Sequence, residues 1–318
     1  MMSTWQDFLH TQRLAQTQAN AFCSINAQAK ALIALDHLGV LSLTGSDAAQ
    51  FLQGQMTCDI KEVSDTQSRF GAFCDVKGKV LTTFILSQLG DEYRLILPKV
   101  LIELIKTRLQ RYVLRAKVII TDKSEQLCLI GTIASNTELL FSTTTDNNHQ
   151  IIHLHNRQLI ITSIDNAISL WQEKLAQGFQ VQAINNWHCA DIIANMAWLD
   201  LNTSEQFIPQ MLGIDKLGGI SFTKGCYTGQ EIVARTHYLG KVNRSLLTAE
   251  VITTTVIESN TVIINDNEQT VGRVLTAQLL EANRWLVLLV LSNSETERHL
   301  YLSDNSELCL LESNFCYN

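Results

Sequence analysis

The sequence predicts an α+β protein with two similar strand-and-helix halves followed by a small β-barrel. Before residue 205, strand-like runs are twice followed by an amphipathic helix. Beyond about residue 244, only short strand-like runs remain, separated by polar pairs such as Asp266-Asn267. With 46% hydrophobic and 17% charged residues among 318, the chain suits two or three folded domains and not a disordered polymer.

The first half is expected to form strands, a short helix and a longer helix. Ser46-Asp47 supplies a helix start and Gly54 a stop. Pro98 suits the first turn of the longer helix, which continues to about residue 112. Residues 1–30 read as a helix or an arm. The expected strands are 38–43, 70–75, 80–88, 93–97 and 118–121, with a turn at 76–79.

The second half repeats this order, and the barrel follows it. Asp165 looks like the N-cap of a helix that Gly178 ends, and 184–197 is expected to be helical too. The predicted organisation is an α+β region over 1–240, with subdomains at about 30–122 and 123–205 and a loop region at 206–240, then a barrel over 241–318. The expected strands are 127–133, 151–154, 159–164, 246–252, 261–265, 271–277, 284–291 and 308–311.

Charge and cysteine usage limit the classes of partner and the cellular compartment that suit this chain. The net charge of −7 argues against a wholly basic nucleic-acid binder but allows a local basic patch. The longest apolar run, 285–291, is far below the ~20 residues of a membrane span. The eight cysteines form no C-x-x-C pair, and the start shows no signal peptide. We therefore expect a cytoplasmic protein with reduced thiols and no membrane contact.

Glycine is concentrated around one cysteine. Six of the 15 glycines fall within residues 213–240, just after Pro209. They frame Lys224-Gly225-Cys226-Tyr227-Thr228-Gly229-Gln230-Glu231, a loop whose backbone N–H groups and lysine favour a thiolate. The alternative is a tight turn around a buried structural cysteine. Lys224, Arg235, Lys241 and Arg244 also make this stretch basic, which suits an anionic ligand such as a phosphate, a polyglutamate tail or RNA, or else is an ordinary solvated face.

Two other features allow a functional and a structural interpretation. His149, His153 and His155 lie in an alternating strand without a carboxylate or cysteine at ligand spacing, so exposed strand histidines are expected and no metal site is predicted. Trp187 could stack on a flat heteroaromatic ligand or fill the core.

Three motifs resemble the YgfZ family, relatives of the glycine-cleavage T-protein. They are Phe207-Ile208-Pro209-Gln210 with the Lys224–Glu231 octad, the block 44–59 that contains Gln53-Gly54-Gln55-Met56-Thr57-Cys58-Asp59, and the hairpin Cys74-Asp75-Val76-Lys77-Gly78-Lys79. The likeness runs from about residue 36 to 245. It implies a T-protein fold of three subdomains in a ring around a folate site.

The resemblance also implies a function and its residues. It implies an accessory role in assembling or maintaining iron–sulfur enzymes, and through them in tRNA modification such as thiolation. Cys226 would be the working thiol and a possible transient cluster ligand, and Lys224 and Arg235 would tune it or hold an anionic tail. The implied folate contacts, with tetrahydrofolate as the expected cofactor, are Trp187, Tyr227, Gln230 and Glu231.

Three departures from the family pattern bear on this reading. Thr82-Thr83 stand where T-proteins carry an Asp pair, which argues against aminomethyl transfer and against a classical enzyme. Ile193 replaces a glutamate of the family's pterin site, and Leu38 a second tryptophan. The alternatives to the accessory role are a folate-dependent one-carbon or aminomethyl transferase and a direct tRNA-binding protein. The partners expected are folate, iron–sulfur enzymes that thiolate tRNA, and tRNA itself.

Overall fold

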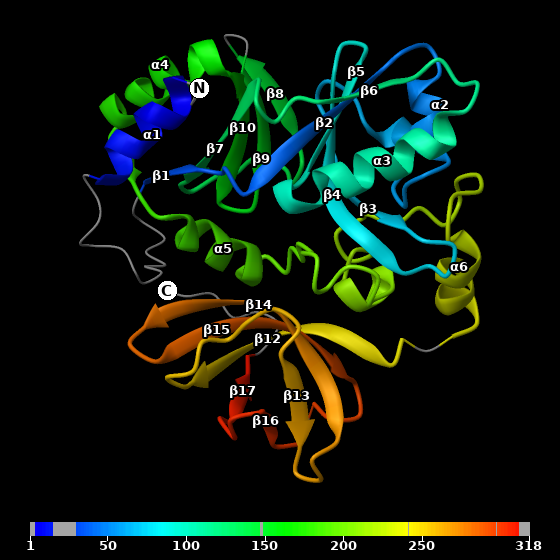
Figure 1. Cartoon of the computed structure of the whole chain (residues 1–318), viewed down its shortest axis with the longest axis vertical. Coiled ribbons are helices and arrows are strands. Elements are labelled where there is room, and N and C mark those ends of the chain that lie inside the picture. The colour runs from blue at the N-terminus through cyan, green and yellow to red at the C-terminus, as the bar shows by residue number, and fades with distance from the viewer. Residues whose placement is uncertain (1–3, 15–29, 147–148, 241, 297, 312–318) are drawn as a thin grey trace.

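Three β-sheets organise the chain, two in an α+β body and one in a barrel below it (Figure 1). The computed structural model describes residues 4–14, 30–146, 149–240, 242–296 and 298–311. The predicted α+β class with a C-terminal barrel is confirmed by these sheets.

The first sheet follows the order β3-β4-β5-β2-β6. Strands β2 and β4 are almost fully buried along their length, as expected where both faces are covered, whereas β6 at the edge of the sheet is only partly buried. On one side α3 packs through Ile102, Ile105 and Leu109, which recur at helical spacing. The elements are β2 (Leu38–Thr44), α2 (Ala48–Gln53), the 3-10 turn η1 (Ile60–Glu62), β3 (Arg69–Cys74), β4 (Val80–Leu89), β5 (Glu92–Pro98), the 3-10 turn η2 (Lys99–Leu101), α3 (Ile102–Val113) and β6 (Ile119–Asp122).

The second sheet follows the order β11-β1-β7-β10-β9-β8 and packs on the first. Alternation along its strands separates two cores: Ile33 and Ile161 join the core shared with the first sheet, whereas Leu32 and Ile160 face α1 and α4. The elements are α1 (Thr4–Leu14), β1 (Ala31–Ala34), β7 (Leu127–Ile133), β8 (Thr143–Asp146), β9 (His149–Leu154), β10 (Arg157–Ser163), α4 (Ile164–Ala176), β11 (Gln180–Val181) and α5 (Ile184–Ile193).

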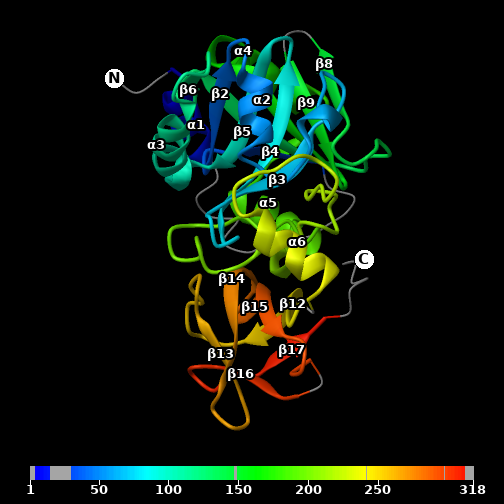
Figure 2. The ribbon, with the colours of Figure 1, turned by 90° about the vertical axis from the view of Figure 1, so that its right-hand side faces the viewer.

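The third sheet, in the order β16-β13-β14-β15-β12-β17, curls into a nearly closed barrel (Figure 2). A bridge between Tyr301 and Glu307 brings its two end strands together. Between α5 and the barrel run the 3-10 turn η3 (Pro209–Leu212), a long loop and α6 (Gln230–Tyr238). The barrel strands are β12 (Arg244–Ile252), β13 (Val262–Asn265), β14 (Thr270–Glu281), β15 (Arg284–Ser292), β16 (Leu300–Leu302) and β17 (Leu308–Leu310).

Several details differ from the expectations. The helix expected over 184–197 ends at Ile193, and Asn195 adopts a left-handed φ of 51° that an α-helix does not allow. Strand β16 was not expected. His149 and His153 are buried, contrary to the expected exposed histidines, since His149 Nδ1 lies 2.8 Å from the Thr162 hydroxyl and His153 meets Asn136 and Thr144. Of the predicted N-terminal helix or arm, Thr4–Leu14 forms the helix α1, and residues 1–3 and 15–29 lie outside the described residues.

Candidate functional site

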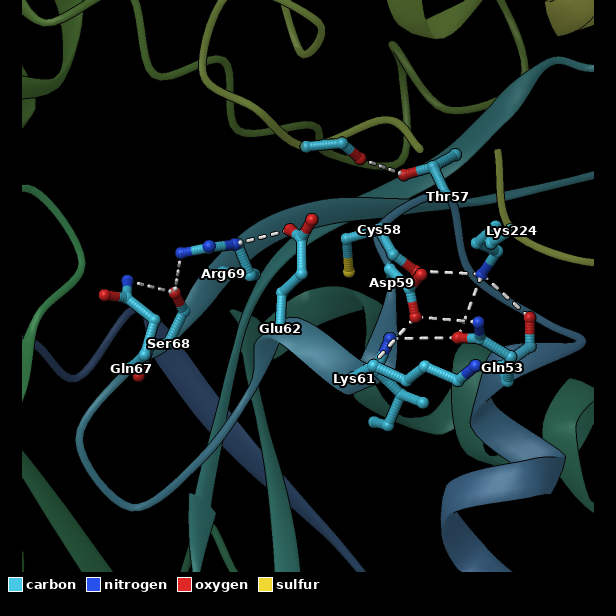
Figure 3. Close-up of polar contacts among 12 residues, drawn as sticks. Gln53, Thr57, Cys58, Asp59, Lys61, Glu62, Gln67, Ser68, Arg69 and Lys224 are labelled. Carbon is cyan, nitrogen blue, oxygen red and sulfur yellow. Dashed lines mark hydrogen bonds and ion pairs between the residues drawn. The ribbon is translucent and has the colours of Figure 1, made fainter. Parts of the chain in front are cut away.

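The Cys226 loop, residues 219–229, is fastened to the loop after α2 by a buried lysine. The Lys224 ammonium donates to the carbonyl oxygens of Gln53 at 2.8 Å, Met56 at 2.7 Å and Cys58 at 2.8 Å (Figure 3). An ammonium group has three N–H donors, so the three carbonyls satisfy it fully. Lys224 therefore joins segments that lie 166 to 171 residues apart in the chain.

Backbone groups reinforce the same junction. The Thr57 hydroxyl donates to the Gly219 carbonyl at 2.7 Å and accepts from the Ala72 amide at 2.9 Å. The Ser221 amide donates to the Thr57 carbonyl, and the Thr228 amide donates to the Gly54 carbonyl. The Cys226 loop is thus held at both ends to residues 54–58.

A second layer of contacts orders the carbonyls that Lys224 uses. The Gln53 side chain donates to Asp59 at 2.8 Å and accepts from the Ile60 amide at 2.9 Å, and Asp59 also accepts from the Lys61 amide (Figure 3). Burial lowers the pKa of Lys224 to about 8, although the neighbouring Cys58 and Asp59 act in the opposite direction.

The thiol of Cys226 is exposed, so the alternative of a buried structural cysteine is not what the structure shows. Of the six described cysteines, four are buried and only Cys226 and Cys309 are exposed. Burial raises the pKa of Cys58 and Cys74 to about 12, which keeps these thiols protonated and inert. The Lys224 ammonium donates to backbone carbonyls. Its predicted effect on the Cys226 thiol stays a prediction.

The other predicted residues divide between this loop and α6. Tyr227 is buried with its ring 4.9 Å from the Lys224 nitrogen, and its hydroxyl has no hydrogen-bond partner among the described residues. Gln230 is half-buried, and Glu231 and Arg235 are exposed on α6. The predicted basic cluster is divided, since Lys224 is buried, Lys241 lies outside the described residues and Arg244 begins β12.

Trp187, on α5, is buried in the core that the first two sheets share. Its side chain is 1% exposed, the Arg157 guanidinium lies 4.6 Å from the ring centroid, and the ring packs directly on Gly131, where an added Cβ would lie 2.6 Å from ring carbons. A pterin needs an open ring face to stack on. Trp187 therefore does not fit a pterin in this conformation.

Arg157 and Asp191 form a buried ion pair that sequence reasoning missed. The guanidinium lies 2.7 Å from the Asp191 carboxylate and donates to the Trp187 carbonyl at 3.2 Å, with both charged side chains at most 3% exposed. The available signal was Asp191, an aspartate between Ala190 and Ile192, because a charge in an apolar stretch requires a partner; Arg157, which follows Asn156 at the start of β10, carried no such signal. This pair fixes α5 against β10.

Two further predictions can be placed. Thr82 and Thr83 are fully buried in β4, and the Thr83 hydroxyl donates to the Ala197 carbonyl at 2.7 Å, so they serve packing within the body. Within the described ranges, no group of three or more His, Cys, Asp or Glu residues could hold a metal ion. No helix in the described part of the chain is long and apolar enough to cross a membrane.

Comparison with known proteins agrees with the fold and the motifs. No protein-family model matches the chain. The structure is similar to the glycine cleavage system aminomethyltransferase T from Bartonella henselae, with a TM-score of 0.74 and 12% identity over 91% of this chain and 86% of that one. This likeness confirms the predicted three-subdomain T-protein fold.

The sequence itself shows a closer relationship. The chain is 33% identical over 279 residues to the tRNA-modifying protein YgfZ of Colwellia psychrerythraea strain 34H, covering 82% of this chain and 85% of that protein. The loop motif, the fold and this identity over most of both chains together place the chain in the YgfZ family.

Proposed function

We propose that this chain supports tRNA modification as an accessory protein to iron–sulfur enzymes, with Cys226 as its working thiol. The observation that carries the proposal is the contrast between one exposed thiol in a tightly held loop and the buried cysteines around it. The name of its relative, a tRNA-modifying protein, supports the biological setting.

The geometry suits a transient ligand better than a permanent cluster site. A thiolate binds iron, and clusters are usually held by four ligands. Cys226 offers one ligand from an exposed loop, so the remaining ligands of a cluster in transit would come from the partner enzyme. Because the loop is fastened at both ends, the sulfur keeps a fixed place on the surface. This favours a partner enzyme that docks on the loop as it stands over a loop that folds around the partner.

The test uses cells that lack this protein and carry either of two cysteine variants. Cys226→Ala should lower the level of iron–sulfur-dependent thiolated nucleosides in tRNA at least severalfold, as measured by mass spectrometry of tRNA digests. Cys309→Ala is the matched control, because Cys309 is exposed on a barrel strand. Full thiolation with Cys226→Ala would show that the thiol is not the working group.

Tetrahydrofolate is proposed as a ligand near the loop, with Tyr227, Gln230 and Glu231 as its predicted contacts. Calorimetric titration of the parent protein, Glu231→Gln and Trp187→Phe tests these contacts separately. Because Trp187 is enclosed by Arg157 and Gly131, Trp187→Phe should leave the affinity unchanged. Glu231→Gln should weaken it, and absence of heat with the parent protein would exclude folate as a ligand.

A further inference from the structure

A run of cations on α3 and in the segment just after it stands out in an acidic chain. Residues 106–117 contain five basic residues and no acidic one, which leaves 19 basic and 31 acidic residues elsewhere, a net charge of −12. We call these cations the α3 basic surface: Lys106, Arg108, Arg111, Arg115 and Lys117.

The fold turns this surface toward solvent. The apolar side of α3 packs into the core, while Arg111, Arg115 and Lys117 are exposed and Lys106 and Arg108 are half-buried. None of the five belongs to a salt bridge within the described ranges. Unpaired neighbouring cations repel one another, so this surface favours a ligand that supplies negative charge.

The surroundings add contacts other than charge. Tyr112, at 40% exposure, and Leu114, at 88%, lie between the cations. The acids near these cations include Glu103 on α3, Asp75 in the hairpin beside Arg108, and Asp47, whose carboxylate accepts the Lys117 backbone amide at 2.7 Å. The cations therefore outnumber the acids around them. The partly exposed ring of Tyr112 is also accessible for stacking with a nucleic-acid base.

The α3 basic surface adjoins the candidate site through the β3–β4 hairpin. Arg108 lines a small cavity with Gln55 and Cys74, and an added Cβ on Gly229 would lie 3.1 Å from the Cys74 Cβ. The hairpin thus lies between α3 and the start of α6, as Figure 1 also shows. A polyanion on α3 would lie beside the Cys226 loop.

We propose that the α3 basic surface binds the phosphate backbone of RNA. Three of its five cations are arginines, whose planar fork matches phosphate oxygens. A membrane would require the apolar side of the helix, which Ile102, Ile105 and Leu109 bury in the core. The proposal goes beyond the proposed thiol function, and it moves the expected RNA contact from residues 224–244 to α3.

The experiment measures binding of fluorescently labelled tRNA to the full chain by anisotropy at 50 to 200 mM KCl. The parent protein should lose affinity steeply with salt. Arg111→Ala/Arg115→Ala should bind about tenfold or more weakly at 50 mM, with the slope of log K against log salt shallower by about 1.5, since each lost phosphate contact removes ~0.7 to 0.9.

Lys174→Ala/Arg298→Ala is the control, because it also removes two positive charges, one from α4 and one from the barrel. It should bind tRNA as the parent protein does. No detectable tRNA binding, a salt-independent affinity, an equal loss in the control, or tighter binding to phosphatidylserine vesicles than to tRNA would overturn the proposal. The thiol proposal is tested by the thiolation assay and not by tRNA affinity, so the two proposals can fail independently.

Discussion

The hydrogen-bond partners of the Lys224 ammonium are backbone carbonyl groups. Burying an ammonium is costly unless every N–H finds an acceptor, and the carbonyls of Gln53, Met56 and Cys58 meet that requirement. Removing the lysine would leave these carbonyls in the interior without a donor. The residue therefore positions the Cys226 loop, and an effect of its mutation on thiol chemistry would act through the loop.

The lowered pKa of Lys224 predicts a pH dependence of stability. Between about pH 8 and its ordinary pKa of 10.5, the unfolded chain binds a proton that the folded chain has released. The contribution of Lys224 is thus fully present above pH 10.5 and is lost as the pH falls through 8. The free energy of unfolding of the parent protein, relative to Lys224→Met, should rise by about 1 to 3 kcal/mol from pH 7.5 to 10 in urea titrations. A flat difference would show that the carbonyls keep Lys224 charged.

The Arg157–Asp191 pair predicts strong coupling between two residues. Asp191→Asn leaves the Arg157 charge buried and uncompensated, so it should cost about 3 to 5 kcal/mol of unfolding free energy. Arg157→Met/Asp191→Leu removes both charges and should cost clearly less than the sum of the single variants. Urea unfolding of the double-mutant cycle measures this coupling, and additive costs would contradict a direct charge pair.

At the scale of elements, the start of α6 depends on one glycine. Gly229 has a φ of 84°, and an added Cβ would lie 2.5 Å from the Asp75 carbonyl oxygen. Gly229→Ala should therefore destabilise the protein by about 2 kcal/mol or more and disturb how the hairpin turn meets α6.

Gly225 provides the matched control on the other side of Cys226. An added Cβ there meets nothing within 4 Å. Gly225→Ala should change the thermal midpoint little, while Gly229→Ala lowers it by several degrees. Equal midpoints for the two variants would mean that the hairpin turn yields without cost.

The elements that sequence patterns predicted are those with local signals. The α3 stripe, the β3–β4 hairpin and the Gly54 stop need only neighbours in sequence. Strand β16 has three residues, too few for a pattern, and the left-handed Asn195 follows an alanine that favours helix. The carbonyl partners of Lys224 lie more than 160 residues away, so no local pattern could predict them.

The same limit applies to the candidate site. The glycine-rich motif located the exposed Cys226, but its lysine was assigned to the thiol and not to the carbonyls. The α3 basic surface is visible in the sequence as 12 residues with five cations. The apolar stripe of the same helix, however, predicts only its packing against the core. Pairing of β1 with β7, almost 100 residues on, likewise needs the structure.

For the whole molecule, strand β15 is one of three barrel strands that pack against the body, together with β12 through Leu246 and β14 through Leu275 and Leu280. Its residues alternate between two cores: Leu286, Leu288 and Val290 pack in the core of the α+β body, whereas Val287, Leu289 and Leu291 fill the barrel. Successive side chains of a strand point to opposite faces, so one strand can serve both. Figure 1 shows α5 lying over β14 and β15 at this junction.

This arrangement predicts that two neighbouring leucines stabilise different parts of the molecule: Leu288 the junction with the body, and Leu289 the interior of the barrel. Leu288→Ala and Leu289→Ala each remove a fully buried side chain and should each cost about 2 to 5 kcal/mol. Leu288→Ala weakens the junction, so calorimetry should show body and barrel unfolding in separate steps, with a calorimetric enthalpy above the van't Hoff enthalpy. Leu289→Ala weakens the barrel interior and should lower the stability of the barrel while the body core stays intact. If both variants unfold in one unchanged two-state transition, the body and barrel are coupled by contacts other than the outward face of β15.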